Sequence, residues 1–474
     1  METLPDDILL LVGNYLERHD DRYTATFVNR QFHTVFSRVL YRSVSLKRQS
    51  QVQSFLKALL LYPHLVPVVR SLAIEDWRDE SEKTSLSHGD IAMFSRWASA
   101  NSHSKEEHQR WEKDLCHGSD EAWIALLLSL VHNLRSLKVL WQRDSRYLET
   151  VFVRATTQQK PFDLHPAFYR LEELSLGWLP GGKVDIGKSA FLDSQIKPFL
   201  QLPRLKKLSI DSFVECPRVA RDERGGDEQT DDNEEQEQHA PKPTINSTIT
   251  DLDISSSNGA KGVTNLLVPC SSLKSFKYQH TDEFDAAGFQ PSAFHRTLSQ
   301  HKSTLETIWL DNFGTHNAFT ATGLNESCDE WCSSFADFTG LKELRIRLPN
   351  LFDIPYTLEP TTALTELLPA QIESLFIEGC KENQLTMLTH QLRGVLDARK
   401  SRFKALRRVV VEGFFHVDDE DLDASGTDGQ AGSTERVIKP AVYETVKPLR
   451  EACDRAGVGM SVRDRACPGT LRVE

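Results

Sequence analysis

Short stretches of the pattern L-x-x-L-x-L, with strong apolar residues at the three marked positions, recur along most of the chain. They are VRSLAI (69–74), LRSLKV (134–139), LEELSL (171–176), LKKLSI (205–210), ITDLDI (249–254), LKSFKY (273–278), LETIWL (305–310), LKELRI (341–346), IESLFI (372–377) and LRRVVV (406–411). Mostly polar residues lie between, as a strand with one buried face requires. The bare triple is common by chance. The prediction of a strand series therefore depends on the polar residues between the apolar ones and on recurrence at intervals of 24 to 44 residues from position 171 onward.

Segments with helical spacing of apolar residues lie between these strands, for example 292–300 and 384–400. Two further helical regions are predicted around 90–115 and 120–133, and a helix at 443–456 with a short strand at 458–462 would close the series. One strand–helix repeat cannot bury its own apolar face, whereas stacked repeats can. Residues 47–474 are therefore predicted to form an α/β repeat solenoid, with parallel strands on one face and helices on the other.

This pattern resembles the leucine-rich-repeat family, in a long and irregular form, over about residues 65–465. The Asn or Cys that normally follows the strand in that family is mostly absent here, and the repeat spacing varies. The resemblance implies a stack of strand–helix repeats.

The apolar pattern of residues 1–46 differs from that of the repeats and predicts three short helices. The segment LPDDILLLVGNYL at 4–16 places two acids at a helix start, where they suit the helix dipole, and then apolar residues at helical spacing. A polar break precedes the segment 23–46, which carries the remaining helical apolar positions. A unit this small is marginal alone, so we expect a partner to cover its remaining apolar face.

The order Leu-Pro-acid-acid-Ile-Leu, a Tyr-Leu pair, Val-Asn-Arg-x-Phe and a closing Leu-Tyr-Arg resembles an F-box. In that family the helices dock on the Skp adaptor of SCF-type ubiquitin ligases, within a cullin-based complex. The adaptor-facing residues implied by motif position are Leu4, Pro5, Ile8, Leu9, Val12, Leu16, Val28, Arg30 and Phe32. Phe32 replaces the usual Trp, and Arg22 stands where an apolar residue is common. An ordinary helical cap on the solenoid is the alternative.

The formal charge of −12 is concentrated in two short stretches. Residues 222–239 carry a net −8 and residues 418–435 a net −7, so the rest of the chain is near +3. The absence of a broad basic field argues against nucleic acid as the main partner. Acidic insertions at about 215–247 and 417–436 contain too little apolar material to form a core, and we predict that they are disordered loops, with a docking role as the alternative.

Eight scattered cysteines without a C-x-x-C pair predict reduced thiols and no metal site. The acidic N-terminus does not resemble a signal peptide, and the apolar runs are too short for a membrane span. We therefore expect a cytoplasmic or nuclear location, without membrane contact. Phosphate-binding, zinc-protease and serine-hydrolase motifs are missing, so neither an enzyme activity nor a cofactor is expected.

Recognition of a protein is the remaining role, and strand parity predicts where it takes place. The outward central positions of the strands are Lys138, Ser175, Ser209, Asp253, Lys277, Trp309, Arg345, Phe376 and Val410. Trp309, Arg345, Arg347 and Phe376 are the candidate substrate-binding residues, because Trp and Arg often dominate interface energies. A terminal loop that covers the two aromatic rings is the alternative. Trp141 and Trp178 fall on the core-facing parity.

Together these features predict a non-catalytic substrate-recognition subunit of an SCF-type ubiquitin ligase. The F-box would hold the adaptor, and the solenoid would bind a protein target. Two alternatives remain at this stage: an F-box scaffold without a degradation target, and a leucine-rich-repeat GTPase activator, since such activators also join a repeat array to acidic segments.

Overall fold

The computed structural model describes residues 4–16, 18–75, 87–117, 119–141, 146–163, 166–178, 190–215, 246–259, 261–281, 289–311, 331–354, 359–416, 437–464 and 467. The chain divides into two compact units. Unit 1 comprises Met1–Ser189, Ser194–Asp211 and Ile245–Ile249, and unit 2 comprises Ala190–Asp193, Ser212–Thr244 and Thr250–Glu474. The predicted insertions therefore fall largely on residues 216–245 and 417–436, which lie outside the described residues.

Unit 1 begins with three helices, α1 (Asp6–Tyr15), α2 (His19–Ala25) and α3 (Arg30–Arg42). Its strands are β1 (Ser43–Leu46), β2 (Ser71–Ile74), β3 (Ser136–Trp141), β4 (Glu173–Trp178) and β5 (Lys207–Asp211). The other helical elements are α4 (Gln49–Leu61), η1 (Pro63–Val68), α5 (His88–Asn101), α6 (Lys105–Cys116), α7 (Asp120–Leu128), α8 (Arg146–Thr156), α9 (Asp193–Ile196, which starts in unit 2) and η2 (Phe199–Gln201). Each strand pairs in parallel with the next one in the sequence.

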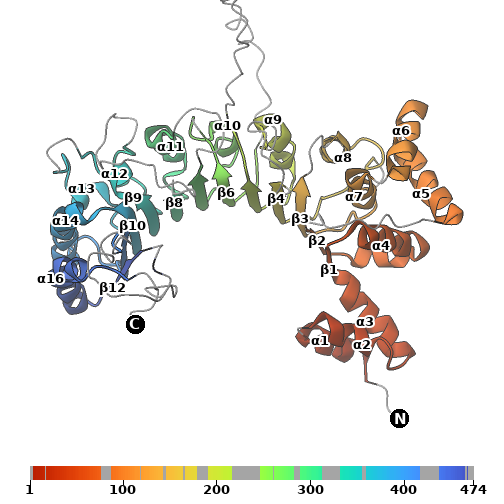
Figure 1. The fold of residues 1–474 in the computed structure, drawn as a ribbon, viewed down its shortest axis with the longest axis horizontal. Helices are drawn as coiled ribbons and strands as arrows, with labels where there is room; N and C mark the ends of the chain where they lie inside the picture. Colours follow the sequence, from red (N-terminus) through yellow and green to blue (C-terminus); the bar gives the residue numbers. More distant parts are fainter. Residues whose placement is uncertain are drawn as a thin grey trace, which may run out of the picture. The chain divides into compact units, whose positions relative to one another are not determined.

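Unit 2 repeats this arrangement with the strands β6 (Asp251–Ser257), β7 (Ser275–His280), β8 (Thr307–Asp311), β9 (Glu343–Arg347), β10 (Ser374–Cys380), β11 (Arg408–Gly413) and β12 (Gly459–Arg463). Between them lie α10 (Thr264–Leu267), α11 (Pro291–Leu298), η4 (Ser299–His301), α12 (Leu348–Leu351), α13 (Leu364–Leu367), η6 (Glu382–Gln384), α14 (Leu385–Asp397) and α16 (Pro440–Ala456). These strands are also parallel and follow sequence order. In each unit the helices that connect successive strands lie on one side of them (Figure 1).

The predicted strand pattern is confirmed in both units. In β3 the side chains of Leu137 and Val139 are buried while Lys138 between them is exposed, and β9 repeats this alternation with Leu344 and Ile346. Burial of each such side chain contributes roughly 1.5–3 kcal/mol, which is why the repeats stack. Helices also form near 292–300, 384–400 and 443–456, as α11, α14 and α16. An α/β solenoid of parallel strands and helices is thus the observed architecture.

Two predicted boundaries differ from the structure. Strand β1 lies inside residues 1–46 but pairs with β2, so the strand series begins at Ser43 rather than at 47. Glu215, assigned to the first insertion, is buried, and its carboxylate accepts hydrogen bonds from the backbone N–H groups of Lys261, Val263 and Thr264. Residues 246 and 247 are likewise described. A buried carboxylate that receives three hydrogen bonds keeps the start of this segment in place.

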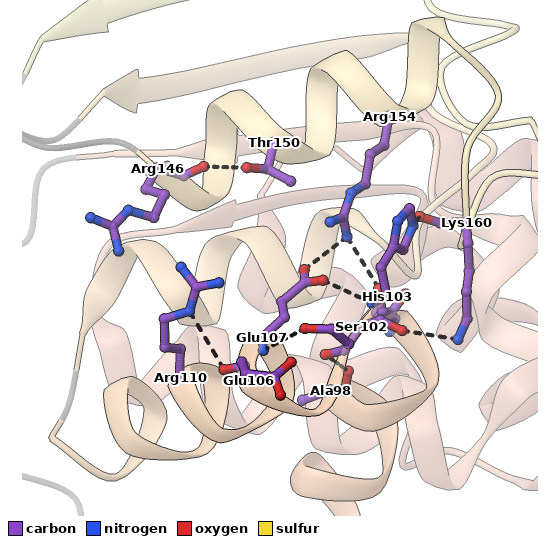
Figure 2. A network of polar contacts seen from close by, with 12 residues as sticks. Ala98, Ser102, His103, Glu106, Glu107, Arg110, Arg146, Thr150, Arg154 and Lys160 are labelled. Atoms are coloured by element: carbon purple, nitrogen blue, oxygen red, sulfur yellow. Dashed lines mark hydrogen bonds and ion pairs between the residues drawn. The ribbon is translucent and has the colours of Figure 1, made fainter.

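The long interval between β2 and β3 holds a helical pair, α5 and α6, which polar contacts tie to α8 (Figure 2). Glu107 of α6 forms an ion pair with Arg154 of α8 at 2.9 Å, and both side chains are only 15% exposed. Glu107 also accepts a hydrogen bond from the backbone N–H of His103, while the Nζ of Lys160 donates to the carbonyl of Ser102. These contacts close the loop between α5 and α6 against the next repeat.

Candidate functional site

The three N-terminal helices share a small apolar core. Leu9 of α1 packs with Val35 and Phe36 of α3, and several half-buried side chains surround them, namely Leu10, Leu16, Ala25 and Phe32. Helix α1 approaches α3 closely at Gly13, where an added Cβ would stand 2.9 Å from a methyl carbon of Val39. The three helices therefore pack against one another through this small core.

Polar contacts hold the connections between these helices. The Asn29 side chain accepts a hydrogen bond from the N–H of Phe32 at 2.9 Å and so caps the start of α3. Gln31 donates to the carbonyl of Leu4 at 2.7 Å and fixes the entry to α1. Arg22, which departs from the F-box pattern, donates through Nε to the carbonyl of Leu16 at 2.7 Å, next to the end of α1. Arg22 thus has a structural role, since it binds the carbonyl of Leu16.

The N-terminal helices also expose large apolar side chains to solvent. Eight large hydrophobic side chains between residues 4 and 28 are between 44% and 79% exposed. We call them the N-terminal apolar face: Leu4, Ile8, Leu11, Val12, Tyr15, Tyr23, Phe27 and Val28. Ile8, Leu11, Val12 and Tyr15 follow the spacing i, i+3, i+4 and i+7, which places them on one side of α1. Only eighteen such exposed side chains occur among all the described residues, so this is a marked concentration.

Of the adaptor-facing residues predicted from the motif, most are exposed and one is buried. Leu4, Pro5, Ile8, Val12, Val28 and Arg30 are exposed, as docking residues would need to be. Leu9 is 1% exposed and belongs to the core, because its position on α1 faces α3. Leu16 and Phe32 are half-buried against that core, and Phe32 stacks on Phe36 with ring centroids 5.3 Å apart. The motif did not single out Leu11, Tyr15, Tyr23 or Phe27, although helical spacing alone indicates the first two.

A second surface lies on the outward face of the strands in unit 2. The pairing register places Asp253, Lys277, Trp309, Arg345 and Phe376 directly beside one another on β6 to β10. We call these five residues the central row. Lys138, Ser175 and Ser209 hold the matching positions in unit 1. The predicted row is therefore confirmed as a continuous line of side chains within each unit for these eight positions.

Cations and aromatic rings alternate along the central row. The Nζ of Lys277 lies 3.8 Å from the ring centroid of Trp309, and the guanidinium of Arg345 lies 5.3 Å from that centroid and 4.5 Å from that of Phe376. Arg463 of β12 approaches Phe376 from the other side, at 5.7 Å. Each contact of this kind stabilises its geometry by about 0.5–2 kcal/mol. The sequence pattern did not indicate the contributions of Lys277 and Arg463 to this stack.

Arg347 was wrongly predicted to belong to the exposed patch, since it is 1% exposed. Its register partner on β10 is Glu378, which is fully buried and accepts hydrogen bonds from Arg345 at 3.1 and 3.3 Å. Strand parity gives the direction of a side chain but not what covers it. The opposing carboxylate on the next strand gives the buried Arg347 a local counter-charge. Val410, also expected to face outward, is buried in the same part of the sheet.

A hollow of about 270 Å³ lies at one end of the central row. It is lined by Asp253, Ser255, Lys277, Tyr278, Gln279, Trp309 and Arg345. Partial loss of hydration raises the pKa of Asp253, against the opposing effect of the Lys277 ammonium group. Trp309 and Phe376 themselves are half-buried, and the Nε1 of Trp309 donates to Glu343 at 3.1 Å. The hollow therefore presents ring edges, a lysine and a carboxylate to a partner.

Comparison with known protein families bears on the second surface. Residues 234–435 match the leucine-rich repeat domain. The matched range includes strands β6 to β11 and so the whole of the central row, and domains of this kind suit protein interaction. The match does not extend to residues 1–46, where the F-box resemblance depends on the motif and on the helical packing described above. No curated protein matches the chain.

Neither surface is accompanied by a metal or membrane signature in the part of the chain that the structure describes. Groups of three or more His, Cys, Asp or Glu side chains that could hold a metal ion are not found among those residues. None of the helices described there combines the length and the apolar character needed to cross a bilayer.

Proposed function

We propose that this chain is the non-catalytic substrate-recognition subunit of an SCF-type ubiquitin ligase, acting in the cytoplasm or nucleus. The N-terminal apolar face binds the Skp adaptor of the cullin-based complex, and the outward face of the solenoid binds the target. The protein then supplies proximity between a target lysine and a ubiquitin-carrying enzyme, rather than chemistry of its own.

One observation carries the first half of this proposal. Eight large apolar side chains on a three-helix unit remain in water, although the same unit has a formed core and a third helix that is capped by Asn29. Exposed apolar clusters of this kind mark protein interaction sites. The F-box motif covers the same segment and includes four of the eight residues, namely Leu4, Ile8, Val12 and Val28. The matched repeat domain supports an interaction role for the solenoid.

The central row supports the second half. Arg345 is already ion-paired with the buried Glu378, so a target contacts it mainly as a flat stacking surface. Lys277 projects over Trp309 at the rim of the hollow and is the cation best placed to meet an acidic group. An extended acidic segment with one apolar anchor residue fits this combination.

The adaptor half is tested with Ile8→Asp combined with Val12→Asp. Both side chains are exposed in the free protein, so the helices should stay folded, whereas the complex would have to bury two charges. We expect at least a hundredfold loss of affinity for purified Skp adaptor, measured by calorimetry. Val153→Asp, on an exposed apolar residue of α8, is the matched control and should bind normally. Undiminished adaptor binding by the double variant contradicts the proposal. Leu9 is unsuitable for this test because its replacement removes core packing.

The target half is tested with Lys277→Ala combined with Trp309→Ala. This variant leaves the Arg345–Glu378 pair in place, so it removes contact groups without exposing a buried charge. We expect it to keep adaptor binding but to lose capture of ubiquitinated partners, compared with Lys138→Ala at the matching position of unit 1. Capture equal to wild type would place target recognition elsewhere. Intact adaptor binding without any captured target in the wild type would favour a scaffold.

A further inference from the structure

Three successive strands of unit 1 begin with the same pair of residues. Arg42-Ser43, Arg70-Ser71 and Arg135-Ser136 precede or open β1, β2 and β3. The register aligns the serines with one another, as Ser43 with Ser71 and Ser71 with Ser136. Consecutive pairs lie 28 and 65 residues apart in the sequence, so the alignment is a property of the fold.

The backbone brings the three arginines into direct succession. The N–H of Arg70 donates to the carbonyl of Arg42 at 2.9 Å, and the N–H of Arg135 donates to the carbonyl of Arg70 at 2.7 Å. Neighbouring strands are about 4.8 Å apart, so three guanidinium groups start from adjacent positions on one edge of the sheet. We call these three residues the arginine ladder. Like charges placed opposite one another on neighbouring strands are destabilising.

Arg70, in the middle of the ladder, has the least hydrated guanidinium. Arg42 and Arg135 are exposed, whereas Arg70 is half-buried and its buried Nη1 has no hydrogen-bond acceptor among the described residues. Burial, together with the charges of Arg135, Arg170 and Arg42, lowers the pKa of Arg70 from its usual range. The carboxylate of Glu172 lies 3.9 Å from Arg135, but both side chains are largely exposed and the pair contributes little.

A hollow in the same unit is lined in part by Arg170, whose charge acts on Arg70 of the ladder. Its volume is about 360 Å³, and it is lined by His132, Asn133, Pro166, Tyr169 and Arg170, without an acidic residue in that lining. The guanidinium of Arg204 lies 5.6 Å from the Tyr169 ring on the next repeat. This volume falls within the range of about 300–1,000 Å³ that is common for small-ligand sites. Cations and neutral donors thus gather at the strand-start edge of unit 1.

We propose that Arg42, Arg70, Arg135 and Arg170 form a binding site for a phosphate monoester. A phosphate dianion offers three terminal oxygens and about two negative charges, so it can bridge neighbouring guanidinium groups that one carboxylate cannot serve together. The half-buried Arg70, with its unused donor, would gain an acceptor. A nucleic acid is a poorer fit, because the basic residues form one short cluster in a chain of net charge −12. The site is separate from the surfaces of the proposed function and does not depend on them.

Titration of the full chain with four probes at constant ionic strength tests this site. The probes are a phosphoserine peptide with neutral flanking residues, its unphosphorylated form, its Ser→Glu form and inorganic phosphate. We expect the phosphopeptide to bind at least tenfold more tightly than the Ser→Glu form. Arg42→Gln combined with Arg135→Gln should weaken phosphopeptide binding at least tenfold. Arg48→Gln combined with Arg96→Gln removes the same charge from exposed positions of unit 1 outside the ladder, and should change binding less than twofold.

The thermal midpoint of each variant without ligand is a second measurement, which detects misfolding. Since the substitutions remove like-charge repulsion, the ladder variant should have a thermal midpoint equal to or above that of wild type. Equal affinity for the phosphorylated and Ser→Glu peptides, or equal losses in the ladder and control variants, would overturn the proposal. If the site is confirmed, inorganic phosphate that binds as tightly as the peptide indicates a small phosphate ester, and a tenfold preference for the peptide indicates a phosphorylated protein.

Discussion

At the scale of single residues, Glu121 of α7 is an ionisable group placed almost entirely inside the protein. It is 6% exposed, and burial raises its pKa to about 7 from an ordinary value of 4.5, although Leu148 donates a backbone hydrogen bond to it at 2.9 Å. The folded protein therefore holds this proton more tightly than the unfolded chain does. Stability should fall as the pH rises from 4.5 to about 7. We expect Glu121→Gln to raise the thermal midpoint by several degrees at pH 8, and to change it little at pH 5.

Thermal unfolding followed by circular dichroism at the two pH values checks this prediction. Glu149→Gln, on the exposed side of α8, is the control and should have the same small effect at both. A Glu121→Gln variant that is no more stable than wild type at pH 8 would show that the carboxylate is not held protonated.

At the scale of elements, the helical pair α5–α6 is an addition to the repeat that a polar link ties to α8 (Figure 2). Arg154→Met would leave Glu107 mostly buried without its cation and would also remove the hydrogen bond from Arg154 to the carbonyl of Asn101. We expect a loss of about 1–3 kcal/mol. Amide hydrogen exchange measured by mass spectrometry should become faster in α5 and α6 and stay unchanged in β3 and β4, because the strands have their own ladder of hydrogen bonds.

The control for this link is Arg110→Met on the exposed side of α6. The Nε of Arg110 donates a hydrogen bond at 3.5 Å to the carbonyl of Glu106, which belongs to the same helix. Faster exchange in both variants would indicate a general weakness of α6 rather than a link to α8.

At the scale of the whole molecule, the acidic segment 222–239 carries a net −8 but almost no apolar material. Its deletion leaves twelve residues between Glu215 and Asn246. Long surface insertions cost little, so we expect the thermal midpoint to shift by less than a single core substitution would produce. Calorimetry of the deletion variant checks this, and a drop of many degrees would show that the segment packs against the repeats.

Much of this architecture followed from local pattern. All ten L-x-x-L-x-L segments form strands, and each strand begins at or near the third residue of its segment. Alternation with a period of two, and apolar spacing of three and four residues, are properties of a single element, so they can be read before any tertiary contact is known. The outward direction of Trp309, Arg345 and Phe376 was determined in the same way.

Only the tertiary structure decided which apolar or charged side chains are covered and which distant residues become neighbours. Leu9 and Ile8 are equally apolar, but the approach of α3 buries one and leaves the other 45% exposed. Arg347 has the parity of an outward residue, yet the packing around Glu378 removes it from water. The arginine ladder joins residues from three repeats whose sequence spacing is irregular. Burial and register depend on the packing of many elements together, and a local sequence pattern does not contain that information.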